Sequence, residues 1–376
     1  MFIFWQHSRE SIVVQMRVTW VFPKLYNHPI GGYKVHYQYA NAMASRGHDV
    51  TLVHPTTDEN PTSLAYRALL AAARVRGVIE RKPPISWFEF EPTVRSLLIT
   101  SLTSSSLPDA DVTVLTAWQT AARTREDAPQ AGVLAQIVYD YEFWQGDQEH
   151  RDIIGAALGR RDVAKIATSS AVASMLEEIG TTPIATIRAG LRDGEFGIDA
   201  PVEGRERVVV FALRFEETKD LPTAFEAVRI ILSEMPDVRI ECFGRATHHV
   251  LPKGIVSHGH VSNAELRALY NRASVFLLSS RFEGWGLPAA EAMACGAAVV
   301  ATRCGGVEDF VHDEINGLLV PVGDPRALAD STLRLLRDEP TRVRLATKGA
   351  HDTGEQSLRR SSDQLEHVLW SLADRP

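Results

Sequence analysis

The sequence has few cysteines, no long apolar run and no excess of positive charge. Three cysteines among 376 residues are too few and too scattered for a disulfide framework. No stretch approaches the roughly 18 apolar residues that a membrane-spanning helix needs, and the first residues lack the pattern of an export signal. The net charge of −7 and a pI near 6.0 argue against the basic face of a nucleic-acid binder. We therefore expect a cytoplasmic chain with no nucleic-acid partner, in which Cys242, Cys295 and Cys304 are reduced and packed.

Several catalytic motifs are also missing from the sequence. There is no Gly-x-Ser-x-Gly elbow, no Walker loop and no complete Gly-x-Gly-x-x-Gly, so hydrolases, nucleoside triphosphatases and typical dehydrogenases lose their best support. No internal repeat stands out, which sets solenoids and propellers aside. With 45% hydrophobic and 23% charged residues, the composition is that of a globular protein, and the length fits two domains.

Apolar runs typical of strands alternate with helical segments along the whole chain. The strand-like runs are Val18–Phe22, Val50–Val53, Ser86–Phe90, Val112–Leu115, Val133–Val138, Ile166–Thr168, Ile184–Ile187, Val208–Ala212, Val238–Phe243, Ile255–Ser257, Val275–Leu278, Ala298–Ala301 and Leu318–Val320. Helices are predicted at Leu221–Glu234 and Asp324–Arg337, among others. Such alternation is typical of parallel βαβ units. The sequence therefore predicts an α/β fold with two doubly wound parallel sheets.

A change of composition marks the predicted domain boundary. Between Arg192 and Arg207 the chain is rich in Asp, Gly, Glu and Pro without apolar periodicity, which is typical of a linker. We expect a first domain at 1–196, a linker at 197–206 and a second domain at 207–357. Residues 358–376 form a final helix that packs on one of the two, with a return to the first domain as our expectation. Residues 1–15 are interpreted as an upstream extension, a hypothesis that a strand-paired segment there would reject.

The segment from Arg281 to Ala294 carries the most informative motif. It places Glu283 and Glu291 on either side of a glycine turn that joins a buried strand to the helix predicted at Leu287–Cys295. Glu283 can accept hydrogen bonds from sugar hydroxyls. Glu291 lies about one turn inside the helix, where a carboxylate can hold a ribose diol.

Backbone groups at the same turn favour a phosphate. Gly284 and Gly286 follow the carboxyl end of the predicted strand, where parallel sheets bind ligands. The N–H groups at the helix start, near Leu287 and with Pro288 in the first turn, present a partial positive charge. The alternative is structural, since a glycine-rich turn between a strand and a helix occurs in many α/β proteins.

The whole segment, with Gly305-Gly306-Val-Glu308 after it, closely resembles the donor-site signature of retaining glycosyltransferases of family four. The resemblance extends from about Arg17 to Arg344. It implies GT-B architecture: two Rossmann-like, doubly wound parallel-sheet domains facing a central cleft, with the first binding the acceptor and the second the nucleotide sugar. By the same resemblance His258 to Val261 shapes the nucleobase loop, so Val261 is a donor-binding candidate.

Two cations follow the predicted strand Val208–Ala212. Arg214 and Lys219 suit a diphosphate, because a guanidinium and an ammonium can offset the charge of a departing nucleotide. An isolated pair of this kind is more often a solvated loop. The segment resembles the family's Gly-Arg-Leu-x-x-x-Lys-Gly, with Leu213 and Asp220 in place of its glycines.

Two other segments are candidates for the site. Gly31 and Gly32 lie between the first strand and a long helix, where paired glycines let backbone approach a ligand, and the region resembles the family's amino-terminal loop. Asp140, Tyr141, Glu142 and Trp144 suit an acceptor sugar, although the simpler explanation is a loop cluster that only packs the domain. Relatives carry a histidine in this region and this chain does not, so no general base is assigned.

Histidine pairs and a basic run have plain structural explanations. His248-His249 and His258-x-His260 lack the third and fourth ligands of a metal site, so no metal and no cofactor are expected. The basic residues of the first domain, Arg67, Arg74, Arg76, Arg81 and Lys82, allow peripheral contact with an anionic membrane. A run of this kind is usually a solvated helix face.

The resemblance implies a metal-independent glycosyltransferase that moves a hexosyl-type unit from a nucleotide diphosphate sugar to a hydroxyl acceptor with retention. Its partners are that donor and an acceptor such as a glycan, a polysaccharide precursor or a small-molecule glycoside. Glu283, Arg214 and Lys219 would be its catalytic residues. Two alternatives stay open: a GT-B epimerase or phosphorylase, against whose epimerase form the glutamate pair argues, and a noncatalytic sugar-nucleotide binder.

Overall fold

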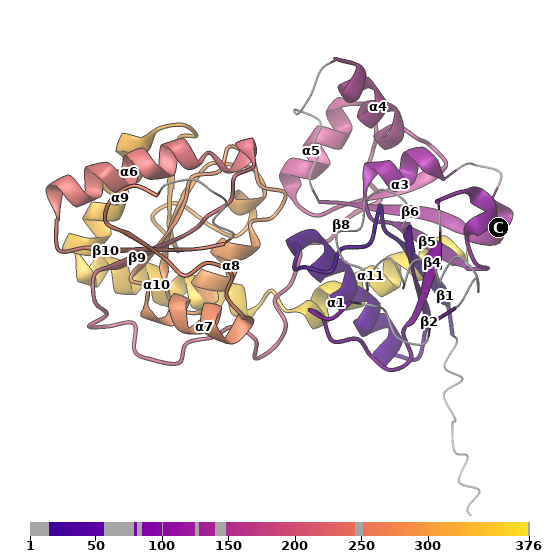
Figure 1. Cartoon of the computed structure of the whole chain (residues 1–376), viewed down its shortest axis with the longest axis horizontal. Coiled ribbons are helices and arrows are strands. Elements are labelled where there is room, and N and C mark those ends of the chain that lie inside the picture. The colour runs from indigo at the N-terminus through magenta and orange to yellow at the C-terminus, as the bar shows by residue number, and fades with distance from the viewer. Residues whose placement is uncertain are drawn as a thin grey trace, which may run out of the picture. The chain divides into compact units, whose positions relative to one another are not determined.

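The chain forms two β-sheets within the part described by the structure, a computed structural model (Figure 1). The described residues are 15–55, 79–80, 85–99, 101–124, 128–139, 148–244 and 251–374. By compactness the chain divides into one unit of residues 1–135 with 368–376 and a second of residues 136–367. The two sheets are separated along the chain by residues 187–207, which include the predicted linker.

The first sheet has eight strands in the order β3-β4-β2-β1-β5-β6-β7-β8. Its strands are β1 (Arg17–Val21), β2 (Asp49–Pro55), β3 (Ile79–Glu80), β4 (Arg95–Ile99), β5 (Val112–Leu115), β6 (Val133–Val138), β7 (Val163–Ala167) and β8 (Ala185–Thr186). The β1–β2, β1–β5, β2–β4 and β7–β8 pairs are parallel, and β3 is antiparallel to β4. The helical segments between them are α1 (Gly31–Ser45), η1 (Ser104–Ser106), α3 (Trp118–Arg123), η2 (Pro129–Ala131), α4 (Gln148–Leu158) and α5 (Ser170–Glu178).

The second sheet has six parallel strands in the order β11-β10-β9-β12-β13-β14. They are β9 (Val208–Ala212), β10 (Arg239–Phe243), β11 (Ile255–Ser257), β12 (Val275–Leu278), β13 (Ala298–Thr302) and β14 (Leu318–Val320). The helical segments are η4 (Glu217–Lys219), α6 (Leu221–Glu234), α7 (Asn263–Arg272), α8 (Leu287–Ala294), η5 (Gly306–Asp309), α9 (Pro325–Arg337), α10 (Glu339–Gly354) and α11 (Leu358–Ala373). Numbered in chain order, the strands run 3-2-1-4-5-6, which is the doubly wound order of Rossmann folds.

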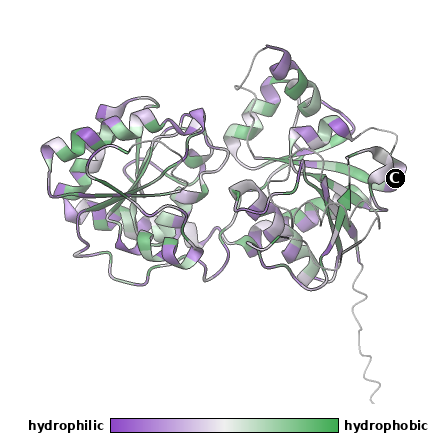
Figure 2. Ribbon diagram, in the orientation of Figure 1, coloured by the Kyte–Doolittle hydropathy of each residue, from purple (hydrophilic) through white to green (hydrophobic). Residues whose placement is uncertain are grey.

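Apolar side chains on both faces explain why the second sheet is covered by helices. The strands β12 and β13 are buried along their whole length, as expected of a parallel sheet between helical layers. Side chains of α6 and α9, such as Val228 and Leu333, pack with Phe211 and Leu277 of the strands in one core. Figure 1 shows α6 and α9 on one side of this sheet and α7 and α8 on the other. In Figure 2 the strands are mainly hydrophobic and the outer helix faces hydrophilic.

The predicted α/β fold with two doubly wound sheets is confirmed, and most predicted elements lie within a few residues of the observed ones. The strands at Val112–Leu115, Val208–Ala212 and Val275–Leu278 and the helix at Leu221–Glu234 have the predicted bounds. The three cysteines are buried and free, as predicted. Residues 1–14 lie outside the described residues, and so do the basic residues of the first domain, Arg67, Arg74, Arg76, Arg81 and Lys82.

The predicted strand at Ser86–Phe90 is wrong. The strand of this region lies later, at Arg95–Ile99, while the rings of Trp87, Phe88 and Phe90 pack around Tyr37 of α1, with centroids 5.0–5.6 Å away. Aromatic residues favour strands in general, but here their burial against a helix determines the conformation.

Two buried histidines lie in the same aromatic region. The ring of His54, at the end of β2, stacks on Phe22 at 4.7 Å, and its Nε2 atom lies 2.9 Å from the hydroxyl of Tyr37. Burial lowers the pKa of His54 and of His36 to about 3. Both rings are therefore neutral at pH 7.

The last turns of the final helix, α11, belong to the first unit. The ring of Trp370 lies 5.8 Å from that of His48, which precedes β2. Neither α11 nor any other helix among the described residues is long and apolar enough to cross a membrane.

Candidate functional site

The strand order of the second sheet places two loops side by side. The chain leaves β9 toward β10 on one side and leaves β12 toward β13 on the other, although β9 and β12 are neighbours. Ligands of open α/β sheets bind at such a switch point, beyond the carboxyl ends of the strands. The loops in question, residues 213–220 and 279–286, carry the predicted cations and the first predicted glutamate.

Lys219 and Glu283 meet across this switch point. The Nζ atom of Lys219 lies 3.0 Å from Oε2 of Glu283, and the side chains are only 17% and 12% exposed. The hydroxyl of Ser280 donates to Oε1 of Glu283 at 2.6 Å. Both carboxylate oxygens therefore have a partner, which fixes the orientation of the group at the ends of β9 and β12.

Further hydrogen bonds join the two loops. The hydroxyl of Ser279 donates to the carbonyl of Lys219 at 2.9 Å, and the N–H of Arg281 donates to the carbonyl of Thr218 at 2.7 Å. Neither serine was a sequence candidate. Their position directly after a buried strand was the signal that could have found them.

A third loop, after β13, lies against Glu283. The N–H of Glu283 donates to the carbonyl of Cys304 at 2.7 Å, and the N–H of Gly306 donates to the carbonyl of Glu283 at 2.8 Å. A Cβ atom at Gly306 would lie 2.1 Å from the carbonyl oxygen of Gly284. Only glycine fits there, which gives Gly305-Gly306 a packing role beside the candidate site.

The start of α8 presents backbone N–H groups next to these loops. Gly286 is the N-cap, with φ +93°, and no side chain caps this described helix. A Cβ at Gly286 would lie 2.6 Å from Val307. Leu287 and Pro288 form the first turn, so the positive end of the helix dipole is available to an anion.

Glu291 lies inside α8 and is buried, with 6% of its surface exposed. The hydroxyl of Tyr270, on α7, donates to its Oε2 atom at 3.3 Å. Burial, and then the charge of Glu291, raise the pKa of Tyr270 well above its ordinary value, so this hydroxyl keeps its proton. Tyr270 was missed from the sequence, because an aromatic residue on an amphipathic helix carries no signal beyond packing.

Arg214, the other predicted cation, forms an ion pair of 2.6 Å with Glu216, two residues later. Both side chains are about half exposed. Burial raises the pKa of Glu216 and Arg214 lowers it, with a net value below the ordinary one. The structure therefore brings Lys219 to Glu283, and Arg214 to a carboxylate of its own loop.

Asp220 stands where the resembling family has a glycine, and the backbone explains both residues. Its φ is +46°, in the left-handed region, which glycine adopts freely and Asp or Asn more readily than other residues. Its Oδ2 atom lies 3.2 Å from Nε of Arg281. This departure from the family motif keeps the turn that follows Lys219.

The remaining candidates lie elsewhere. Val261 is half-buried in the loop between β11 and α7, where the carbonyl of Gly259 accepts from the N–H of Gly244 at 2.8 Å. Gly31 and Gly32 begin α1 in the first unit. The acceptor candidates, Asp140, Tyr141, Glu142 and Trp144, lie outside the described residues.

His258 has a partner other than a metal. Its Nε2 atom lies 2.8 Å from Oε2 of the fully buried Glu241, which also pairs with Arg239 and Arg272. Among the residues that the structure describes, no three His, Cys, Asp or Glu side chains gather as metal ligands would. The expectation that no metal is needed stays a prediction.

Part of the chain is similar in sequence to known proteins. Residues 206–338 match the family described as Glycosyl transferases group 1. The D-inositol 3-phosphate glycosyltransferase of Corynebacterium urealyticum is 38% identical over 112 residues, which are 30% of this chain and 26% of that protein. The match thus spans about a quarter of that relative's length.

Solved structures extend the similarity over nearly the whole chain. Sucrose-phosphate synthase from Thermosynechococcus elongatus is 19% identical, with a TM-score of 0.74 over 95% of this chain and 99% of its own. Anabaena HepE in complex with UDP-glucose is 15% identical, with a TM-score of 0.73 over 95% and 100%. The chain has the GT-B fold.

Proposed function

We propose that this chain is a retaining glycosyltransferase that transfers a sugar from a nucleotide diphosphate sugar to a hydroxyl group. The observation that carries the proposal is the half-buried Lys219–Glu283 pair at the switch point of the second sheet. A fixed carboxylate there can accept hydrogen bonds from sugar hydroxyls. The ammonium beside it can stabilise negative charge that develops on the departing diphosphate.

Each part of the donor has a candidate partner. Glu291 holds the ribose, and the N–H groups at Gly286 and Leu287 bind the diphosphate with Lys219 and Arg214. The loop at Val261 contacts the base. Because HepE was solved with UDP-glucose, we propose a UDP-sugar with a hexosyl unit as the first donor to test.

In the proposed reaction the bond between the anomeric carbon and the diphosphate oxygen breaks. A bond from that carbon to the acceptor oxygen forms on the same face of the sugar. The acceptor proton passes to the departing phosphate oxygen, so neither a protein nucleophile nor a metal is required. The fixed cations and N–H groups stabilise the leaving group, as preorganised charge does in other enzymes.

The acceptor is proposed to be a glycan, a polysaccharide precursor or a small-molecule glycoside. We propose further that the first domain supplies its site, with Gly31 and Gly32 at the start of α1, and that the reaction takes place in the cytoplasm. The contact of the basic run with an anionic membrane remains a separate proposal.

The test begins with nucleotide binding. Unfolding is followed with UDP, GDP, dTDP and ADP, since a ligand at 100 times its Kd adds about 2.7 kcal/mol of stability. The full chain is then incubated with UDP-glucose and a panel of hydroxyl acceptors, with and without EDTA. UDP release is measured, and NMR assigns the anomer of the product.

Acceptor-dependent release of UDP with a product of the donor's anomeric configuration would support the proposal. An altered sugar without an acceptor would identify an epimerase, and a requirement for inorganic phosphate a phosphorylase. Stabilisation by a nucleotide without turnover of any donor would favour a noncatalytic binder. Each of these three outcomes would overturn the proposed transfer.

A further inference from the structure

The hydroxyl of Tyr270 is held in a fixed direction. Tyr270 is fully buried on α7, and three rings surround its own, those of Phe196, Phe243 and Phe276 at centroid distances of 5.7–6.0 Å. From this packed ring the hydroxyl donates to Oε2 of Glu291 at 3.3 Å. A carboxylate has about four lone-pair sites, so this bond leaves Glu291 able to accept from a diol as well.

Residues 187–207 form the connecting segment between the two sheets. Its Arg205 contacts the ends of α7 and α8, the helices that carry Tyr270 and Glu291. The guanidinium of Arg205 donates to the carbonyls of Tyr270 and Ala273 at the end of α7, at 3.4 and 3.0 Å. It also donates to those of Cys295 and Gly296 at the end of α8, both at 2.9 Å. A cation at two helix C-termini satisfies orphan carbonyls and both dipoles.

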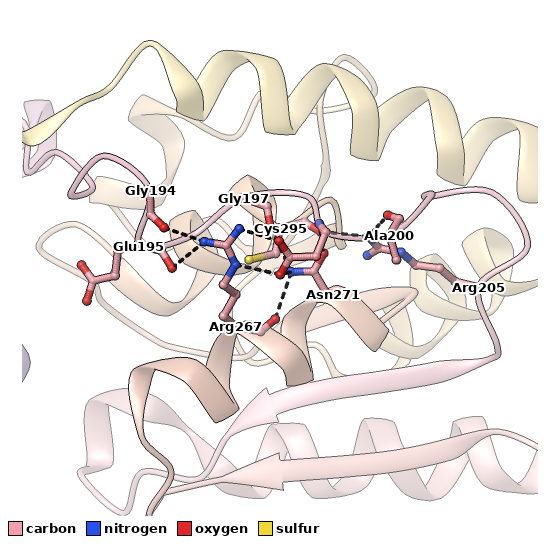
Figure 3. A network of polar contacts seen from close by, with 9 residues as sticks. Gly194, Glu195, Gly197, Ala200, Arg205, Arg267, Asn271 and Cys295 are labelled. Carbon is pink, nitrogen blue, oxygen red and sulfur yellow. Dashed lines mark hydrogen bonds and ion pairs between the residues drawn. The ribbon is translucent and has the colours of Figure 1, made fainter.

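The same segment is fastened to α7 at several points (Figure 3). Arg267 forms a bidentate pair with Asp199, at 2.5 and 2.7 Å, and donates to the carbonyl of Gly194 at 2.6 Å. Asn271 donates to the carbonyl of Gly197 at 2.9 Å and accepts from the N–H of Asp199 at 2.7 Å. Residues 194–205 are therefore held by hydrogen bonds and an ion pair against α7 and the end of α8.

We propose that Tyr270 is a positioning residue that aims the Glu291 carboxylate at the ribose of the nucleotide, and that Arg205 sets the spacing of α7 and α8 on which this aim depends. The inference rests on the proposed function, which assigns the ribose to Glu291. It adds a role for two residues outside the donor motif, and it links the connecting segment to nucleotide affinity.

Ribose discrimination is the readout, because a general loss of stability would not change it. The Kd values of UDP and 2′-deoxy-UDP are measured by calorimetry for the wild type, Tyr270→Phe and Glu291→Gln. The wild type is expected to prefer UDP by about tenfold or more, the value of a hydrogen bond to a charged group. Tyr270→Phe should weaken UDP by about threefold to tenfold with little effect on the deoxy analogue, so that the preference shrinks toward that of Glu291→Gln.

Arg205 has a matched control in Arg342. Arg342 is a buried arginine that also holds the connecting segment, through the carbonyl of Val202 at 3.0 Å, but it pairs with Glu339 of α10 and not with α8. Arg205→Met should reduce the preference for UDP over 2′-deoxy-UDP. Arg342→Met should lower the stability of the chain but leave that preference unchanged. Arg205→Lys serves if the methionine variant does not fold. The double variant with Tyr270→Phe should lose little more preference than Tyr270→Phe alone.

Different results would reject the positioning roles of Tyr270 and Arg205 and the proposed function. If the wild type prefers UDP over its deoxy analogue and Tyr270→Phe retains the full preference, the positioning role of Tyr270 is wrong while the donor site stands. If Arg205→Met and Arg342→Met lose the preference for UDP over 2′-deoxy-UDP equally, the role of Arg205 is rejected. If none of UDP, GDP, dTDP and ADP stabilises the wild type, the proposed function itself is overturned.

Discussion

Lys219 and Glu283 form an ion pair of 3.0 Å between loops that follow two neighbouring strands, β9 and β12. Neither loop could hold this geometry alone, because each supplies one charge. The pair thus ties the motif around Glu283 to the cationic loop, and it yields the first prediction.

Glu283→Gln should reduce transfer by about a hundredfold or more, as removal of one preorganised group at a reacting centre does. The amide keeps the shape of the side chain but loses its charge beside Lys219, which should cost about 1–3 kcal/mol of stability. Initial rates of UDP release and urea unfolding measure the two effects. Glu217→Gln, an exposed residue of the same cationic loop, is the control, and a Glu283→Gln rate equal to that of the wild type would remove Glu283 from the site.

Arg214 and Glu216 should affect nucleotide affinity in opposite directions. Arg214→Ala is expected to weaken UDP binding about tenfold through loss of a charged hydrogen-bond donor. Glu216→Gln should strengthen it by about twofold to fivefold, because the amide holds the guanidinium less strongly. Calorimetry at low salt measures both. Arg229→Ala, which breaks an exposed ion pair with Glu226 on α6, should leave the affinity for UDP unchanged. A loss of affinity in Glu216→Gln would contradict the idea that Glu216 and the nucleotide compete for Arg214.

Gly306→Ala should separate the loops that hold Glu283. The added Cβ would lie 2.1 Å from the carbonyl of Gly284, so backbone must shift at a cost of about 1–3 kcal/mol, and UDP affinity should fall with it. Gly354→Ala is the control, since a Cβ there meets nothing within 4 Å and favours the helix by up to about 1 kcal/mol. Equal unfolding curves for the two variants would show that the close approach of the loops is unimportant.

The buried histidines should make the chain sensitive to mild acid. The pKa of His54 and of His36 is about 3 in the folded chain and about 6.5 when unfolded, so the unfolded state binds more protons between these values. Stability should therefore be full above pH 7 and fall as the pH drops below 6.5, by up to about 1.4 kcal/mol per pH unit for each ring.

Unfolding by urea at pH 7.5 and 5.5 tests this sign. In His54→Gln the decrease between the two pH values should be smaller by about one proton's contribution. His260→Gln, at an exposed position, should keep the slope of the wild type. A stability that rises toward pH 5.5 in the wild type would show that the two rings are protonated in the folded chain.

The sequence was most informative where periodicity and turn chemistry agree. The strand Val208–Ala212, the helix Leu221–Glu234 and the start of α8 at Leu287 could be predicted because apolar runs end at glycine, proline or charged residues. Sequence spacing also put Lys219 and Glu283 at the ends of strands. Their contact followed only from the strand order, which makes β9 and β12 neighbours.

Other features depend on tertiary contacts that no local pattern records. Trp87, Phe88 and Phe90 have the propensity of a strand, yet they pack on α1. Tyr270 resembles any core aromatic residue until Glu291 is placed beside it. The six backbone carbonyls that Arg205 contacts come from three segments of the chain, and a carbonyl is present at every residue whatever its side chain.

The burial of every native thiol has a practical use. Cys242, Cys295 and Cys304 are the chain's three cysteines, and all are enclosed in the second unit. Burial is the main cause that raises the pKa of the Cys295 thiol to about 11, so maleimide reagents near neutral pH should leave it unmodified. A single cysteine introduced on the surface can therefore carry a fluorophore in an otherwise wild-type background, and donor binding can be followed by its emission without rebuilding the interior.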